Sequence, residues 1–182
     1  MKHKFLCNCG IWIATIAGLA AAQQMPGSKS PSVTMAPAPL TSVTQGKPGT
    51  VTLDFRVARG FHINSNKPTS EFLIPTALKL EAPTDIVIGK VTYPPGEDMS
   101  FPFAPDEKLN VYTGDFKINV VVRPLHNVVP TKYAFRGNLK YQACDKAACY
   151  PPKLLPVNFE VKVTKGASTT RRNPAQSPHV HR

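Results

Sequence analysis

The sequence predicts an all-β fold, an antiparallel β-sandwich, and three observations lead to this class. In residues 43–165, apolar and polar side chains alternate with a period of two, which is typical of strands with one buried and one solvated face. Pro, Gly, Asn and Asp occupy the gaps, and no stretch of about ten residues has a helical period. About seven short strands in roughly 120 residues favour a sandwich, with a closed barrel as the alternative.

The clearest strand pattern is in residues 50–58, where Val51, Leu53 and Phe55 share one face and threonine, aspartate and arginine alternate with them. The same pattern predicts strands in order along the chain at residues 76–82, 85–93, 115–122, 132–143 and 155–163. Because residues 133–143 and 154–163 are joined by a short connection, they are expected to form a hairpin.

Two long loops are predicted between these strands, at residues 59–75 and 93–114. Long loops within compact domains are often functional. The second loop carries Phe101 and Phe103 in a polar, proline-rich setting. These rings are expected either to cover a site or to close the end of the sandwich, and the residues alone leave both interpretations open.

The start of the chain predicts a secretory signal peptide over residues 1–22. Lys2 and Lys4 precede an apolar run, residues 11–22, which ends in alanines. This run is shorter than the ~20 residues that cross a bilayer, although an uncleaved anchor is the alternative. We expect export to the periplasm, with cleavage near Ala22.

Composition divides the rest of the chain into three parts. Residues 23–42 are rich in Pro, Ser and Ala and predict a disordered spacer. Residues 43–165 form the predicted domain, and residues 166–182 a disordered basic tail. No further apolar run is long enough to cross a bilayer, so stable membrane insertion is not expected.

The formal net charge of +11 raises the question of a nucleic-acid partner. Part of this charge lies in the predicted signal peptide and tail. The other basic residues are scattered among acidic ones and form no stripe interleaved with aromatic residues. We interpret the charge as solvated surface and expect no nucleic-acid partner.

Cleavage of the signal peptide removes Cys7 and Cys9 and leaves Cys144 and Cys149. In an oxidising compartment these two are presumed to be a pair. A metal clip is one alternative, but a tetrahedral site needs three or four ligands, and the candidate histidine nearest a predicted loop is His62. We expect no metal and no cofactor.

A structural staple is the second alternative, because facing residues of a hairpin are close enough for a disulfide. Such a bond closes a ring of about six residues and contributes only about 2 kcal/mol on loop-entropy grounds. Residues 145–148 form a small polar turn that leaves the sulfurs accessible, as thiol–disulfide exchange requires. The residues therefore favour a redox-active pair, while a structural bond remains open.

The stretch YQACDKAACYPPK, residues 141–153, resembles the active-site hairpin of the N-terminal periplasmic domain of the bacterial thiol:disulfide interchange protein DsbD. The stretches GFHINSNKP and YPPGE, residues 60–68 and 93–97, resemble the same family in the expected order. The resemblance covers residues 43–165. It implies an immunoglobulin-like sandwich, which agrees with the strand pattern.

The resemblance implies a role for each cysteine. Cys149 is expected to form the mixed disulfide with partner proteins, and Cys144 to resolve it. A phenylalanine on a mobile loop is expected to cover the sulfurs until a partner docks. Phe103 is the first candidate for this cap and Phe101 the second.

Three further residues are expected to line the site: His62, Asn64 and Tyr150. The expected function is periplasmic thiol–disulfide exchange, as a component of a protein-disulfide reductase system. Electrons would pass from a thioredoxin-like donor to disulfide-containing client proteins. The family continues into a membrane-embedded electron carrier and a thioredoxin-like domain, so the donor is expected on a separate chain. The rival hypothesis is an exported binding module whose disulfide rigidifies a recognition hairpin.

Overall fold

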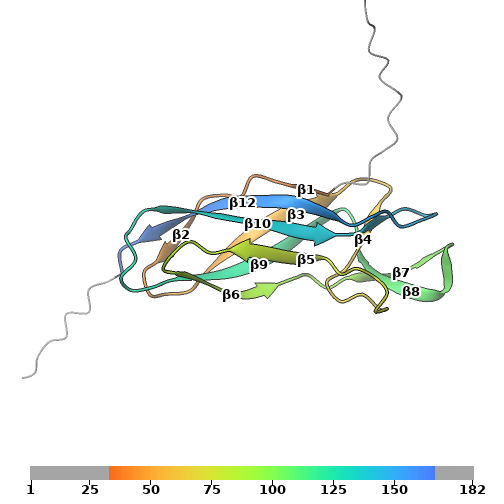
Figure 1. Cartoon of the computed structure of the whole chain (residues 1–182), viewed down its shortest axis with the longest axis horizontal. Coiled ribbons are helices and arrows are strands. Elements are labelled where there is room, and N and C mark those ends of the chain that lie inside the picture. Colours follow the sequence, from red (N-terminus) through yellow and green to blue (C-terminus); the bar gives the residue numbers. More distant parts are fainter. Residues whose placement is uncertain (1–32, 167–182) are drawn as a thin grey trace, which may run out of the picture. The chain divides into compact units, whose positions relative to one another are not determined.

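The structure is a computed structural model that describes residues 33–166 (Figure 1). The predicted signal peptide, the first part of the predicted spacer and residues 167–182 of the predicted tail lie outside the described residues. Strands and the connections between them make up the described part, and it contains no helix. Accordingly, no helix capable of spanning a membrane is found there.

The strands form three sheets of four strands each. In spatial order, the first contains β1 (Val33–Met35), β3 (Gly49–Val57), β9 (Asp115–Pro124) and β6 (Ile86–Thr92). The second contains β2 (Thr41–Thr44), β12 (Lys153–Thr164), β10 (Lys132–Tyr141) and β5 (Ala77–Glu81). The third contains β11 (Ala143–Cys144), β4 (His62–Asn64), β8 (Ala104–Tyr112) and β7 (Glu97–Phe101).

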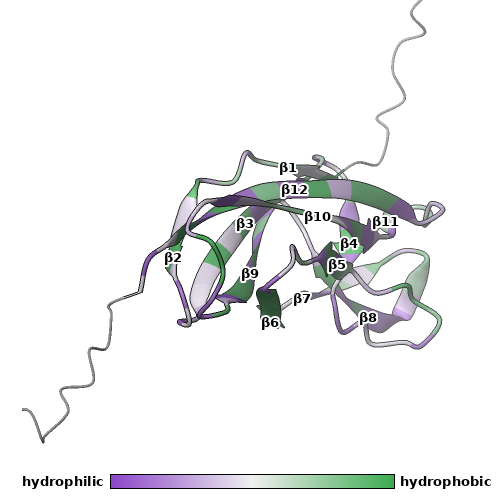
Figure 2. Cartoon of the chain, turned by 60° about the vertical axis from the view of Figure 1, so that its left-hand side comes forward, coloured by the Kyte–Doolittle hydropathy of each residue, from purple (hydrophilic) through white to green (hydrophobic). Residues whose placement is uncertain are grey.

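The main core is built from alternate residues of the first two sheets. Figure 2 shows the corresponding apolar and polar bands along β12. The buried residues on the four longest contributing strands are Val51, Leu53, Phe55 and Val57 of β3, Phe116, Ile118, Val120 and Val122 of β9, Phe135, Leu139 and Tyr141 of β10, and Val157, Phe159, Val161 and Val163 of β12. This arrangement confirms the all-β, immunoglobulin-like sandwich, and the open sheets exclude the barrel alternative.

The folded part begins earlier than the sequence predicts. The composition of residues 33–42 predicts a disordered spacer, but β1 pairs with β3, and β2 begins at Thr41 and pairs with β12. The β2–β12 pair is parallel, whereas the other pairs of the described strands are antiparallel. Pro37 and Pro39 separate β1 from β2, and because proline donates no ladder hydrogen bond, the chain leaves one sheet there and joins the other.

The two segments predicted as long loops also contain strands. Residues 97–101 and 104–112 form an antiparallel hairpin, β7–β8, and residues 62–64 form β4. The sequence pattern does not predict this hairpin because its first strand has no alternation: Phe101 is the buried residue of β7, and the other four are exposed. A second, small apolar cluster forms here from Phe101, Leu109 and Val111, with Leu73 packed against it.

Gly137 of β10 is expected to tolerate no larger residue, because a Cβ atom there would overlap the carbonyl oxygen of Lys79 on β5. We therefore expect Gly137→Ala to weaken the β5–β10 pairing and lower the free energy of unfolding by about 1–3 kcal/mol. Denaturant unfolding measures this change. Asn138→Ala, at an exposed position of the same strand, is the control, and an equal effect of both variants would contradict the prediction.

Candidate functional site

The two cysteines lie in the connection between β10 and β12. These strands pair antiparallel from Lys132 opposite Lys162 to Tyr141 opposite Lys153, which confirms the predicted hairpin. The connection leaves the main ladder after Tyr141 and forms β11, which pairs with β4 in the third sheet. The site therefore lies where the long hairpin meets the third sheet.

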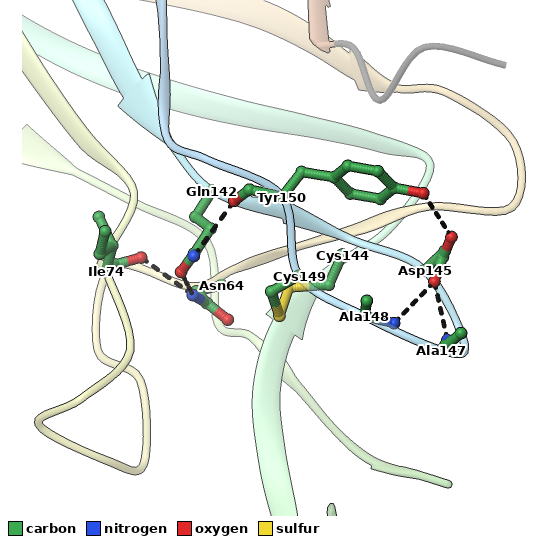
Figure 3. The surroundings of a disulfide bond; sticks show 9 residues. All are labelled: Asn64, Ile74, Gln142, Cys144, Asp145, Ala147, Ala148, Cys149 and Tyr150. Carbon is green, nitrogen blue, oxygen red and sulfur yellow. Dashed lines mark hydrogen bonds between the residues drawn. A yellow bond between two sulfur atoms is a disulfide. The ribbon is translucent and has the colours of Figure 1, made fainter. Parts of the chain in front are cut away.

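Cys144 and Cys149 form a disulfide, with their Cα atoms 4.0 Å apart (Figure 3). Cys144, in β11, is completely buried at 0% exposure, whereas Cys149 is exposed. An attacking sulfur must approach along the axis of the bond, so access decides which half of a disulfide reacts. The arrangement presents Cys149 to solvent and keeps Cys144 behind it.

The turn between the cysteines is organised by the carboxylate of Asp145. Its Oδ1 accepts hydrogen bonds from the backbone N–H groups of Ala147 and Ala148, at 2.7 and 2.9 Å, and its Oδ2 accepts the Tyr150 hydroxyl at 2.7 Å (Figure 3). These bonds hold the pKa of Asp145 below its ordinary value, and the bond from the Ala147 N–H has the largest effect. The sequence predicts only a small polar turn at this stretch. The sequence feature that could have predicted these hydrogen bonds is the aspartate itself, because aspartate side chains commonly accept hydrogen bonds from backbone N–H groups two residues further along the chain.

The two candidate cap residues lie at the tip of the β7–β8 hairpin and meet His62. The Phe101 ring, 8% exposed, stacks on the His62 ring with centroids 3.9 Å apart. The Phe103 ring is 37% exposed, and its centroid lies 5.5 Å from that of Phe101 and 6.4 Å from that of His62. The three rings form a parallel-stacked group, which we call the ring cluster (Phe101, Phe103 and His62).

His62 connects this ring cluster to the disulfide. It is paired with Cys144 across β4 and β11, and paired residues of neighbouring strands project on the same face with Cβ atoms about 4.5–5.5 Å apart. His62 is 4% exposed, and its Nε2 atom has no hydrogen-bond partner. Burial lowers the pKa of His62 to about 4, and the nearby charge of Asp145 opposes this shift. The imidazole is therefore neutral at neutral pH.

Asn64 and Tyr150 are joined by a chain of hydrogen bonds through Gln142. The buried Asn64 donates from Nδ2 to the Ile74 carbonyl at 3.0 Å and to Oε1 of Gln142 at 3.2 Å (Figure 3). Gln142 in turn donates from Nε2 to the Tyr150 carbonyl at 3.2 Å. Gln142 is not among the residues predicted from the sequence, and only its place before the first cysteine points to it.

The lowered pKa of His62 predicts an acid-dependent loss of stability. Between pH 6.5, the ordinary pKa, and about 4, the unfolded chain takes up a proton that the folded chain does not. The free energy of unfolding should fall across this window, by at most about 1.4 kcal/mol per pH unit, and the histidine should contribute nothing further below it.

His62→Gln should flatten this slope, whatever its effect on stability at pH 7. Urea unfolding between pH 7 and 4 tests the prediction, with His126→Gln at an exposed position as the matched control. The carboxylates of Asp115 and Asp145 have lowered pKa values, so they titrate at more acidic pH and are present in both variants. An unchanged slope in His62→Gln would refute the assignment.

The fold and the site together define a class of protein: an immunoglobulin-like sandwich with a half-exposed disulfide on a hairpin, an arrangement suited to thiol–disulfide exchange. The family model described as thiol:disulfide interchange protein DsbD, N-terminal, matches residues 32–160, and the chain belongs to this family. Within residues 33–166, no group of three or more His, Cys, Asp or Glu side chains is placed to hold a metal ion.

Two domains of related proteins are among the solved structures to which the chain is similar. The DsbD N-terminal domain of Neisseria meningitidis, in its reduced form, is 23% identical, with 62% of this chain and 75% of that chain covered and a TM-score of 0.38. The N-terminal periplasmic domain of ScsB from Proteus mirabilis is 13% identical, with 76% of this chain and 48% of that chain covered and a TM-score of 0.47. A search of curated proteins found no match.

Proposed function

We propose that the protein is a periplasmic electron relay that cycles Cys144 and Cys149 between dithiol and disulfide. It accepts electrons from a thioredoxin-like domain and reduces disulfides of periplasmic client proteins. The family and the half-exposed disulfide support thiol–disulfide exchange in general. The signal-peptide pattern of residues 1–22 supports the location.

The observation that carries this proposal is the unequal exposure of the two cysteines. Cys149 is exposed, while Cys144 is buried beside His62 and the ring cluster. A relay needs one sulfur that partners can reach and a second that only the first can reach. A purely structural bond has no use for this asymmetry.

In the reducing step, the Cys149 thiolate attacks a client disulfide and forms a mixed disulfide, and one client sulfur leaves and takes up a proton. The Cys144 thiol loses its proton, and its thiolate attacks the Cys149 sulfur. The Cys144–Cys149 disulfide forms, and the second client sulfur leaves as a thiol. The client gains two electrons and two protons, and the donor dithiol restores the protein by the reverse sequence through Cys149.

In this proposal the ring cluster acts as a cap. Phe101 and Phe103 cover the face on which His62 and Cys144 lie, so small oxidants and thiols meet an apolar barrier. A docking partner displaces the tip of the β7–β8 hairpin. Most residues of β7 are exposed and the supporting apolar cluster is small, so this hairpin has few contacts to lose.

Measurement of the reduction potential, together with exchange against a thioredoxin-like protein, tests the proposal. We expect a potential well above the approximately −300 mV limit below which structural disulfides typically lie. We also expect rapid transfer between the reduced protein and an oxidised thioredoxin-like partner. A potential below that limit, with no transfer, would favour the exported binding module with a structural disulfide.

A further inference from the structure

A pocket opens beside the disulfide hairpin. It has a volume of about 800 Å³, which is within the usual range for binding pockets. Its walls come from the segment that runs from the end of β3 into β4, from the strand β7, from the turn between β8 and β9, and from the turn between the two cysteines. The apolar part of the wall is formed by Val57, Phe61, Met99 and Phe101.

The charged residues that line this pocket are all basic: Arg56, Arg59 and Lys146. Arg56 pairs with Asp115, but within residues 33–166 neither Arg59 nor Lys146 forms an ion pair. Both are exposed. The nearest acidic side chain on the cysteine turn, Asp145, is committed to hydrogen bonds with its own turn and with the Tyr150 hydroxyl. The pocket therefore presents two unpaired positive charges around an apolar wall.

The occupant of this pocket comes from another molecule. The ends of the chain outside the structure, residues 1–32 and 167–182, contain neither aspartate nor glutamate, and the second is basic. Neither of these segments has an acidic side chain to offer Arg59 and Lys146. Lys146 lies between Cys144 and Cys149 in the sequence, so a segment in the pocket is held next to the exposed cysteine.

Resting on the proposed exchange function, we infer that the pocket receives a client segment with a large apolar side chain and at least one carboxylate, close to the client's own disulfide. The apolar side chain packs against Val57, Phe61 and Met99. The carboxylate pairs with Arg59 or Lys146. Complementary charge of this kind speeds encounter and selects partners more than it tightens binding.

The test uses synthetic peptides that each contain one internal disulfide and differ only in the residues beside it: acidic with leucine, basic with leucine, and acidic with serine. The reduced protein, with Cys7 and Cys9 replaced by serine, is mixed with each peptide, and the rate constant of peptide reduction is measured. At low ionic strength we expect the acidic leucine peptide to react about tenfold faster than the basic one. The acidic serine peptide should be slower than its leucine counterpart. The preference should disappear in 1 M salt, where the Debye length is about 3 Å.

The double variant Arg59→Glu/Lys146→Glu should reverse the ratio of acidic to basic rate constants. We use the ratio of the two rate constants because the substitution at Lys146 can also change the reactivity of the nearby thiols. Such a change alters both rate constants by the same factor and cancels in the ratio. Lys132→Glu/Lys162→Glu makes the same change in charge at an exposed cross-strand pair at the far end of the β10–β12 ladder, and should leave the ratio unchanged.

The failure of this inference is distinguishable from the failure of the proposed function. Bis(2-hydroxyethyl) disulfide, which is uncharged, serves as the reference oxidant. Its rate of reaction with the reduced protein that has no substitution in the pocket is compared with the rates of the three peptides. If this oxidant and all three peptides react at comparable rates, exchange stands and the pocket inference is overturned. A ratio that does not change in the Arg59/Lys146 double variant overturns it as well. If the reduced protein exchanges with none of these disulfides, the relay itself is refuted, and the inference with it.

Discussion

A Cys144→Ser variant is expected to accumulate as a covalent mixed disulfide with its partner, whereas Cys149→Ser should form none. The reason is access: Cys149 is exposed, and Cys144 is completely buried. With serine at position 144 no thiolate can attack the mixed disulfide, so the complex persists. With serine at position 149 the remaining thiol, Cys144, is completely buried opposite His62, and exchange should be lost almost completely.

The experiment is best done with Cys7 and Cys9 also replaced by serine, so that the chain contains no thiol outside the pair. Non-reducing electrophoresis and mass spectrometry of mixtures with an oxidised thioredoxin-like protein identify the trapped species. Loss of the disulfide also lowers stability by about 2 kcal/mol on loop-entropy grounds, and equally in both variants. Trapping by Cys149→Ser alone would invert the two roles.

Phe103→Ala should make the buried Cys144 more reactive towards small reagents. The Phe103 ring stacks near Phe101 and His62, and aromatic pairs contribute about 0.5–1.5 kcal/mol beyond burial. Loss of one such interaction raises the population of the open cap, and therefore the rate at which a small alkylating reagent modifies Cys144, by about 2- to 13-fold. Phe101→Ala should act more strongly, because the Phe101 ring is more buried and stacks directly on His62.

Stopped-flow measurement of the alkylation of Cys144 by a small reagent, in the reduced Cys149→Ser background, tests this expectation. Phe72→Ala is the matched control, because Phe72 is 89% exposed in the loop between β4 and β5 and takes no part in the ring cluster. Unfolding curves of each variant separate a local opening of the cap from a general loss of stability. If Phe103→Ala and Phe72→Ala react at the wild-type rate, the rings do not control access.

The strands that could be predicted from the sequence are those in which every second side chain is buried, because this burial gives the sequence an alternation of apolar and polar residues. On β3, β9 and β12 every second side chain enters the core, so the alternation is complete and these strands could be read from the sequence. The strand β1 has three residues, too few for a period to be recognised, and β4 and β7 show no alternation: β4 is buried throughout, and β7 is mostly exposed. These segments become strands because a neighbouring strand provides hydrogen-bond partners for their backbone, and the local sequence pattern does not reveal such a neighbour.

The same division holds for the site. Spacing and export chemistry predicted that Cys144 and Cys149 form a pair, because two cysteines flanking a hairpin turn are close in any fold that contains the hairpin. The stacking of His62 with Phe101 and Phe103 joins β4 to the tip of the β7–β8 hairpin, two segments that meet only in the third sheet. The pocket beside them likewise combines residues from four separate segments.

The sequence by itself determined the fold class, the family and the pairing of the two cysteines, because alternation, turn residues and cysteine spacing act over short stretches of chain. Only the tertiary structure decided which cysteine faces solvent, which rings stack with His62 and where unpaired positive charge gathers. Those properties depend on the packing of distant strands, and burial and charge pairing are fixed only when the strands come together.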